Sequence, residues 1–136
     1  MKNYVASAFM LLFAAFPAHA DDTRSGAIVG VIQNQLDAFQ KDDFATAFTY
    51  ASPTIKRMFQ NPERFGQMVR NGFPMVWRPS EVQFLDFTDT AGETSQMVLF
   101  RDANGVPIVM KYFMVETEQG WQIDGVVPVQ APDVAA

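Results

Sequence analysis

The chain has 136 residues, a net charge of −5, one histidine and no cysteine. Because the histidine is His19, residues 20–136 lack the groups for Ser–His–Asp or Cys–His catalysis and for the usual zinc and copper sites. They also cannot form a disulfide. We expect no cofactor and no bound metal, and the acidic balance argues against nucleic acid as a partner, which requires a basic face.

The first 20 residues have the three parts of a secretory signal peptide. Lys2 supplies the positive region, residues 4–16 form an apolar stretch, and residues 17–20 (PAHA) end in the small-x-small pattern of a cleavage site. The alternatives are a membrane anchor or a buried helix, but a bilayer span needs about 20 apolar residues. We therefore expect cleavage after Ala20 and a periplasmic or secreted protein without a stable membrane anchor. Losing Lys2 with the leader takes the net charge from −5 to −6.

Residues 24–41 carry apolar side chains at helical spacing, which predicts a long amphipathic helix. Three shorter helices should follow, because capping residues precede each of the next apolar clusters. The last of them should end at Gly72, a residue type favoured at helix ends. The capping positions are Asp42 or Asp43, Ser52-Pro53 and Asn61-Pro62. The side chains expected to point inward from the last two helices are Ile55, Met58, Phe59, Phe65, Met68 and Val69.

After residue 72 the pattern changes from helix to strand. Two prolines make a regular helix impossible over residues 73–79. Alternating apolar residues then predict an antiparallel meander, with a two-residue hairpin turn at Asn104-Gly105 and another turn at Gln119-Gly120. The predicted strands are residues 82–87, 95–101, 108–117 and 121–129. Helices followed by a meander indicate one α+β domain over residues 21–130, with helices covering one sheet face and a frayed tail over residues 131–136.

Both faces of the predicted third strand are largely apolar. Ile108, Met110, Tyr112 and Met114 alternate with Val109, Lys111, Phe113 and Val115. In the second strand, Val98 and Phe100 alternate with Met97 and Leu99 in the same way. One helical layer covers only one face, so we expect a second copy of the chain to cover the other and form a homodimer. The alternative is that strong sheet curl hides both faces.

Several segments of this chain resemble the nuclear transport factor two-like superfamily. They are a long helix ending in LDAFQKDDFATAFTYASP, the short helices after it, and a meander closing with GWQIDGV. The resemblance implies a cystatin-like α+β cone, often dimeric through its sheet, with a pocket between helices and sheet. Within it, ASPTIKRMFQNPERFGQMVRNGFPMVWRPSEVQFLD is similar to exported bacterial proteins grouped as domain of unknown function 4864, most specifically at residues 74–79. That group implies a fold and an export route but no activity.

Two functions remain open from the sequence. The first is a non-catalytic, homodimeric binding domain for a small apolar or amphipathic ligand or for a protein partner. Its candidate ligand-binding residues are Trp77, Arg78, Met110, Tyr112 and Trp121. The second is suggested by the isomerases and dehydratases of the same superfamily, in which a carboxylate and a tyrosine move a proton. The candidates for that role are Asp86, Asp124, Tyr50 and Tyr112.

Charge is unevenly spread along the chain. Residues 54–80 contain five basic side chains and one acidic one. This run indicates a solvated helical surface or, alternatively, an anion site or a basic patch that docks on an acidic one. Within it, Arg78 is expected either to pair with Glu81 at the surface or to reach an acidic ligand or an aromatic ring.

Overall fold

The computed structural model describes residues 19–129. The predicted signal sequence up to residue 18 and the predicted tail fall outside the described residues. Within residues 19–129 there are five helices and four strands. The helices are α1 (His19–Gln40), α2 (Phe44–Thr49), α3 (Pro53–Phe59), α4 (Pro62–Gly72) and α5 (Pro74–Trp77). The strands are β1 (Glu81–Thr90), β2 (Glu93–Arg101), β3 (Pro107–Thr117) and β4 (Gly120–Pro128).

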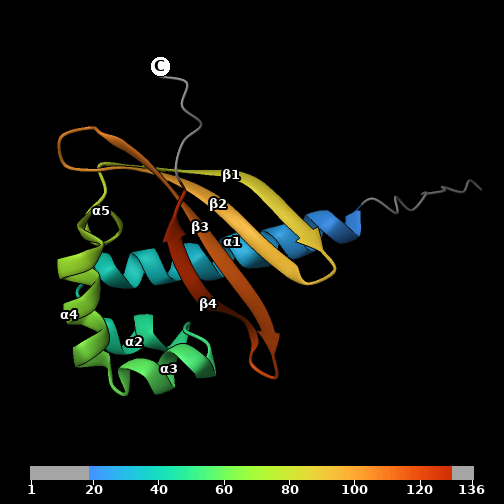
Figure 1. The fold of residues 1–136 in the computed structure, drawn as a ribbon, viewed down its shortest axis with the longest axis horizontal. Coiled ribbons are helices and arrows are strands. Elements are labelled where there is room, and N and C mark those ends of the chain that lie inside the picture. The colour runs from blue at the N-terminus through green and yellow to red at the C-terminus, as the bar shows by residue number, and fades with distance from the viewer. Residues whose placement is uncertain (1–18, 130–136) are drawn as a thin grey trace, which may run out of the picture.

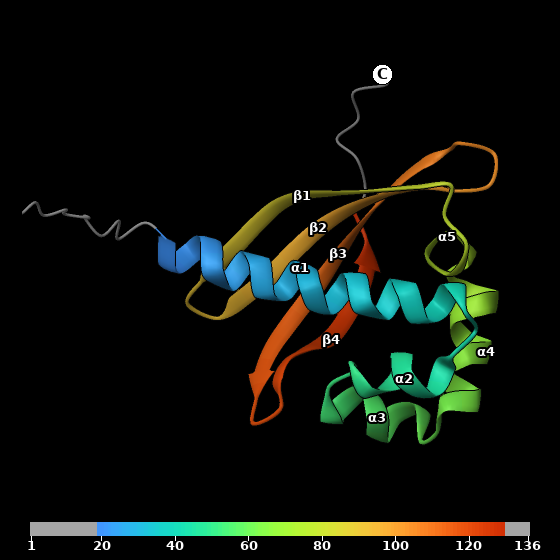
Figure 2. The same ribbon diagram turned by 180° about the vertical axis from the view of Figure 1, so that it is seen from behind.

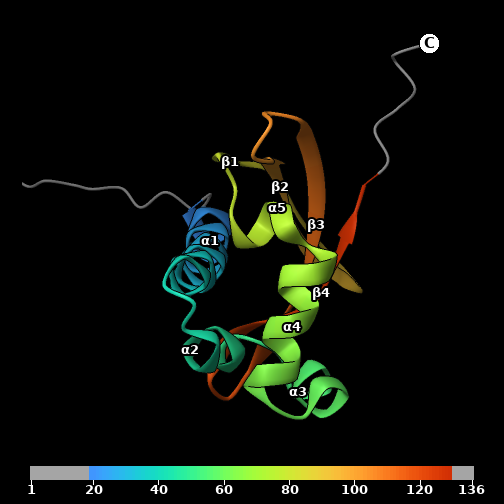
Figure 3. The ribbon, with the colours of Figure 1, turned by 90° about the vertical axis from the view of Figure 1, so that its left-hand side faces the viewer.

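The strands form one antiparallel sheet in the order β1-β2-β3-β4, as the meander pattern predicts. Helix α1 lies behind the strands in Figure 1 and in front of them in Figure 2, so it packs across one face of the sheet. Figure 3 shows the described helices gathered on that same side of β3. The predicted α+β class is therefore confirmed, with helices on one face of an open sheet.

The short helices begin where their capping residues predict. Asp43, rather than Asp42, caps α2 by accepting a 3.1 Å hydrogen bond from the Thr46 backbone. Ser52 and Asn61 cap α3 and α4 in the same way, at 3.2 Å and 2.9 Å, each with proline in the first turn. These bonds satisfy amides that have no partner inside the helix.

Three local predictions are wrong. The segment after Gly72 does contain one helical turn, α5, because Pro74 occupies its first position, where a proline needs no amide donor. The hairpin between β2 and β3 uses the five residues 102–106, because the Asp102 carboxylate accepts from two backbone amides of the loop. Met58 does not point into the core but is 63% exposed.

The two sheet faces have different surroundings. The inner face packs on α1 and contributes fully buried side chains to the core, chiefly Val98, Phe100, Met110, Tyr112 and Ile123. The outer face carries half-buried and exposed apolar side chains, chiefly Met97, Leu99, Val109, Phe113 and Val115. This alternation agrees with the pattern expected for β2 and β3.

A register shift in β4 changes which face of the sheet individual side chains occupy. The β3–β4 register shifts between Phe113 and Met114, which leaves Asp124 as an extra, unpaired residue in β4. Ile123 and Val126 consequently pair with the inner-face residues Met114 and Tyr112. Asp124 and Val126 therefore do not share a face as regular alternation would place them, because a bulge breaks the two-residue period of β4.

The outer edge of β4 is paired with the segment that joins α2 to α3. Ala51 forms a parallel bridge with Ile123. The Ser52 amide donates to the Ile123 carbonyl and the Ile123 amide donates to the Tyr50 carbonyl, both at 2.8 Å. This pairing covers the edge and brings the start of α3 against β4.

Candidate functional site

An apolar pocket of about 340 Å³ lies between α3, α4 and β4. Its volume falls within the range of roughly 300–1,000 Å³ that is typical of small-molecule sites. The helical wall is mainly aromatic, with the Phe65 ring 5.9 Å from that of Phe59 and 6.0 Å from that of Phe39. The apolar side chains that line the pocket include Phe39, Ile55, Phe59, Phe65, Met68 and Val126.

Tyr112 lines the apolar pocket from the inner face of β3. The residue has 0% exposure, and its hydroxyl has no hydrogen-bond partner among the described residues. Burial raises the pKa of the Tyr112 hydroxyl, so this group stays protonated at any ordinary pH. A neutral O–H that can both donate and accept is thus held beside an apolar space.

The rim of the apolar pocket combines one carboxylate with exposed apolar side chains. Asp124 is the single charged residue among the described residues lining the pocket, and its Oδ1 accepts a 2.7 Å hydrogen bond from the Ser52 hydroxyl. Met58 and Val127 also line the pocket, although they are 63% and 42% exposed. The apolar lining therefore continues to the molecular surface at the mouth.

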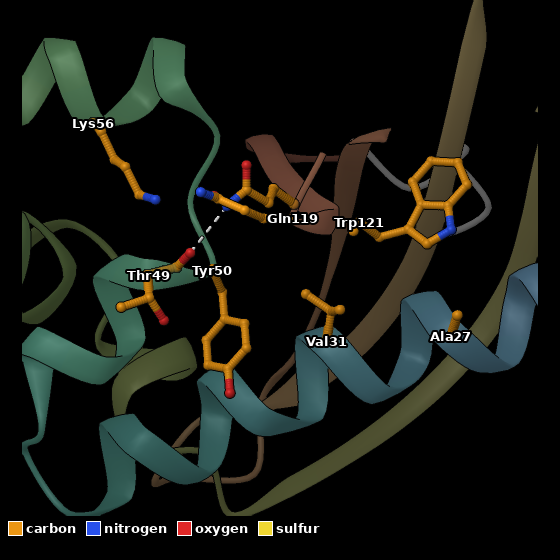
Figure 4. A pocket seen from close by; sticks show the side chains of 9 residues that line it. Ala27, Val31, Thr49, Tyr50, Lys56, Gln119 and Trp121 are labelled. Carbon is orange, nitrogen blue, oxygen red and sulfur yellow. Dashed lines mark hydrogen bonds between the residues drawn. The ribbon is translucent and has the colours of Figure 1, made fainter. Parts of the chain in front are cut away.

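A second hollow, the polar cleft, has a volume of about 630 Å³ and shares no lining residue with the apolar pocket. It is lined by Ala27 and Val31 of α1, the end of α2, Lys56 of α3 and residues 119–122, which cover the end of the β3–β4 turn and the start of β4 (Figure 4). The Trp121 ring at this cleft carries the Arg24 guanidinium 5.4 Å from its centroid. Arg24 in turn forms a 2.6 Å ion pair with Asp89.

Trp77 and Arg78 line neither hollow but hold α5 against the end of α1. The Trp77 indole donates to Asp42 at 2.8 Å. The Arg78 guanidinium lies 4.4 Å from the Trp77 ring centroid, pairs with Asp42 at 3.0 Å and donates to the Phe39 carbonyl at 2.8 Å. The expected Arg78–Glu81 pair is wrong, because Glu81 pairs with Arg101 across β1 and β2 at 3.1 Å.

The other predicted ligand-binding residues are separated in space. Tyr112 lines the apolar pocket, Trp121 lines the polar cleft, and Met110 is 2% exposed on the inner sheet face without lining either hollow. Phe39, Phe59 and Phe65, which form the aromatic wall, were not among the residues predicted to bind a ligand. Their helical spacing gave the signal, but core packing and pocket lining produce the same apolar pattern.

The four residues proposed for proton transfer do not lie together in one site. Asp124 and Tyr112 line the same pocket, Tyr50 lines the polar cleft, and Asp86 is exposed on β1. Neither aspartate is hydrogen-bonded to a tyrosine in the described part of the chain. Asp124 instead supports the cap of α3 through Ser52.

Residues 19–129 contain neither a cluster of metal-ligating side chains nor a membrane-spanning helix. No group of three or more histidine, cysteine or acidic side chains is arranged to hold a metal there. Over the same residues, no helix combines the length and the apolar character needed to cross a membrane.

Comparison with known proteins identifies the family. No curated protein and no solved structure matched the chain. A family profile described as "Domain of unknown function (DUF4864)" matches residues 21–136, which is most of the sequence and includes every strand and nearly the whole of every helix. The chain belongs to the DUF4864 family.

Proposed function

We propose that this chain is an exported, non-catalytic domain of the nuclear transport factor two-like cone type that binds a small amphipathic molecule in the apolar pocket. One observation carries the proposal: the buried Tyr112 hydroxyl lacks a partner in residues 19–129 and belongs to a residue that lines this pocket. The aromatic wall of α3 and α4 would hold the apolar part of the ligand.

The energetic argument rests on the difference between tyrosine and phenylalanine. A buried polar group without a partner costs about 1–3 kcal/mol, whereas phenylalanine at position 112 would fill nearly the same space without that cost. A ligand oxygen or nitrogen that pairs with the Tyr112 hydroxyl would recover the lost hydrogen bond. The tyrosine is thus explained by binding rather than by packing.

The charge around the pocket favours a neutral ligand. Asp124 at the rim is negative, and no basic side chain is among the described lining residues. An anionic group placed in this pocket would lose its hydration and gain no cation. An alcohol, ketone or amide with an apolar body therefore suits the site better than a carboxylic acid.

Titration with decan-1-ol tests the proposal, with decanoate as the charged comparison. Decan-1-ol should bind the wild type, and Tyr112→Phe should weaken its binding about five- to tenfold, the loss of one hydrogen bond. Tyr50→Phe is the matched control, because Tyr50 lines the other hollow, and it should leave the affinity unchanged. Absence of decan-1-ol binding, or equal loss in both variants, would refute the assignment.

Native mass spectrometry of protein purified from an exporting host complements the titration. The mass of the chain tests cleavage after Ala20, and any retained mass reports the natural ligand. A chain that keeps residues 1–20 in the exported fraction would contradict the proposed route.

The alternative function is proton transfer by Asp124 with Tyr112. Their position in one pocket supports it, while the hydrogen bond from Ser52 to Asp124 favours a structural role for that carboxylate. Ligand turnover that Asp124→Asn abolishes would favour the enzyme over the binding domain.

We also propose that two copies pair through the outer sheet face. Besides its apolar side chains, this face carries the ion pairs Lys111–Glu93 and Arg101–Glu81, so it presents both charges to a second copy of itself. Sedimentation velocity should show a dimer that Leu99→Lys dissociates. Asn34→Lys is the control, because Asn34 is exposed on α1, which packs on the opposite, inner face of the sheet. A monomeric wild type at high concentration would exclude this arrangement.

A further inference from the structure

The polar cleft carries positive charge in an acidic protein. Lys56 of α3 is half-buried at its edge and forms no ion pair with a carboxylate of residues 19–129. No acidic residue is among the described residues lining the cleft, although the whole chain has a net charge of −5. In Figure 4 the Lys56 side chain extends from α3 toward Gln119 on the β3–β4 turn. The lysine is therefore available to an anionic group that enters the cleft.

Gln122 provides a second, independent feature of the cleft. The residue is 4% exposed, and its Nε2 donates to the Thr49 carbonyl at 3.1 Å and to Gln119 Oε1 at 3.4 Å. The Thr49 carbonyl, which can only accept, fixes which end of the Gln122 amide carries the nitrogen. Its Oε1 is buried and accepts no hydrogen bond from the described residues. A donor is needed to satisfy this oxygen, and the cleft is the hollow that Gln122 lines.

The remaining lining gives the cleft an aromatic and aliphatic surface. Trp121 lines it from β4 and Tyr50 from the end of α2, with Val31 of α1 between them in Figure 4. The Trp121 ring has a fixed neighbour, since Arg24 lies over it and is itself paired with Asp89. Flat apolar groups pack well against such rings.

We propose that the polar cleft is a binding site for a small aromatic carboxylic acid that also carries a hydroxyl or amino donor. The carboxylate pairs with Lys56, the donor bonds to Gln122 Oε1, and the ring packs against Tyr50 and Trp121. This site is separate from the apolar pocket, because the two hollows share no lining residue in the described part of the chain. The two hollows thus select ligands of opposite character, one neutral and one anionic.

The test uses 3-phenyllactate and its matched analogue 3-phenylpropionate, which lacks only the hydroxyl. We expect 3-phenyllactate to bind the mature protein and to shift the NMR signal of the Trp121 indole. The analogue should bind about tenfold more weakly, because it leaves Gln122 Oε1 unpaired. Lys56→Gln, which keeps a polar side chain but removes the charge, should also weaken 3-phenyllactate binding about tenfold.

Two controls separate this site from the surface and from the apolar pocket. Lys41→Gln alters an exposed lysine that lines neither hollow and should leave 3-phenyllactate affinity unchanged. Tyr112→Phe should also have no effect on this ligand, although it weakens decan-1-ol. The assignment is overturned if 3-phenyllactate in excess leaves the Trp121 signal unmoved, if both acids bind equally, or if Lys56→Gln binds like the wild type.

Discussion

The Ser52 hydroxyl donates a 2.7 Å hydrogen bond to the Asp124 carboxylate across 72 residues of sequence. The same oxygen accepts from the Ile55 amide at 3.2 Å and so caps α3. Asp124 occupies the bulge of β4, where its side chain escapes the strand alternation. One carboxylate therefore fixes the start of the helix that forms a wall of both hollows.

Breaking this link should destabilise the fold. Ser52→Ala removes the cap and leaves Asp124 without its donor, so we expect the free energy of unfolding to fall by about 1–2 kcal/mol. Asp124→Asn should cost less, because its amide oxygen still accepts the bond. Urea denaturation provides the measurement, with Asp86→Asn as the exposed control. A Ser52→Ala midpoint equal to that of the wild type would show that the cap contributes nothing.

Tyr112→Phe should stabilise the ligand-free protein, in contrast to Ser52→Ala. Removing a buried hydroxyl that has no partner in the described chain should raise the free energy of unfolding by about 1 kcal/mol in the ligand-free protein. The same variant binds decan-1-ol more weakly, so stability and affinity change in opposite directions. Urea unfolding of ligand-free protein checks the first effect. If the variant is clearly less stable than the wild type, the hydroxyl has a structural partner and the argument for binding is lost.

Gly66 and Gly30 make a matched pair in α4 and α1. A Cβ at position 66 would lie 2.8 Å from the Phe44 ring, whereas one at position 30 meets nothing within 4 Å. Gly66→Ala should therefore destabilise the protein by about 1–3 kcal/mol through overpacking. Gly30→Ala, in the middle of a helix, should stabilise it by about 0.5–1 kcal/mol. Thermal unfolding of both variants measures these changes in stability. Equal changes in the two variants would refute the close approach of α4 to α2.

The contacts of Asp42 predict an acid-sensitive contribution to stability. Its pKa is lowered by the hydrogen bond from the Trp77 indole and then by Arg78. A carboxylate whose pKa is lower folded than unfolded stabilises the fold above its unfolded pKa of about 3.9. That stability is lost as the pH falls through the lower, folded value.

Comparison with Asp42→Asn isolates this effect. At pH 6 the variant should be less stable than the wild type, and the difference should shrink as the pH falls below about 4. Urea midpoints at pH 6, 4 and 2.5 measure it. A difference that stays constant over this range would mean that hydrogen bonding alone, without the charge, connects Asp42 to Trp77.

Helix caps and strand alternation could be predicted from the sequence, whereas the exposure of Met58 could not. Asp43, Ser52 and Asn61 start their helices as predicted, because a cap depends on amides only two or three residues away. The alternation of inward and outward side chains along β3 could also be predicted, because the pleat has a fixed period of two residues. Met58 was misjudged, because its apolar character is the same at a pocket rim as in a core.

The sequence by itself determined the caps, the order of helices and strands, and the apolar character of both sheet faces, since each depends on neighbouring residues. Only the tertiary structure decided that Arg78 pairs with Asp42, that Asp124 leaves the strand alternation, and that Tyr112 and Trp121 belong to different hollows. These outcomes depend on how segments 30–70 residues apart approach one another. A bulge or a helix crossing sets that approach, and neither leaves a periodic signal in the chain.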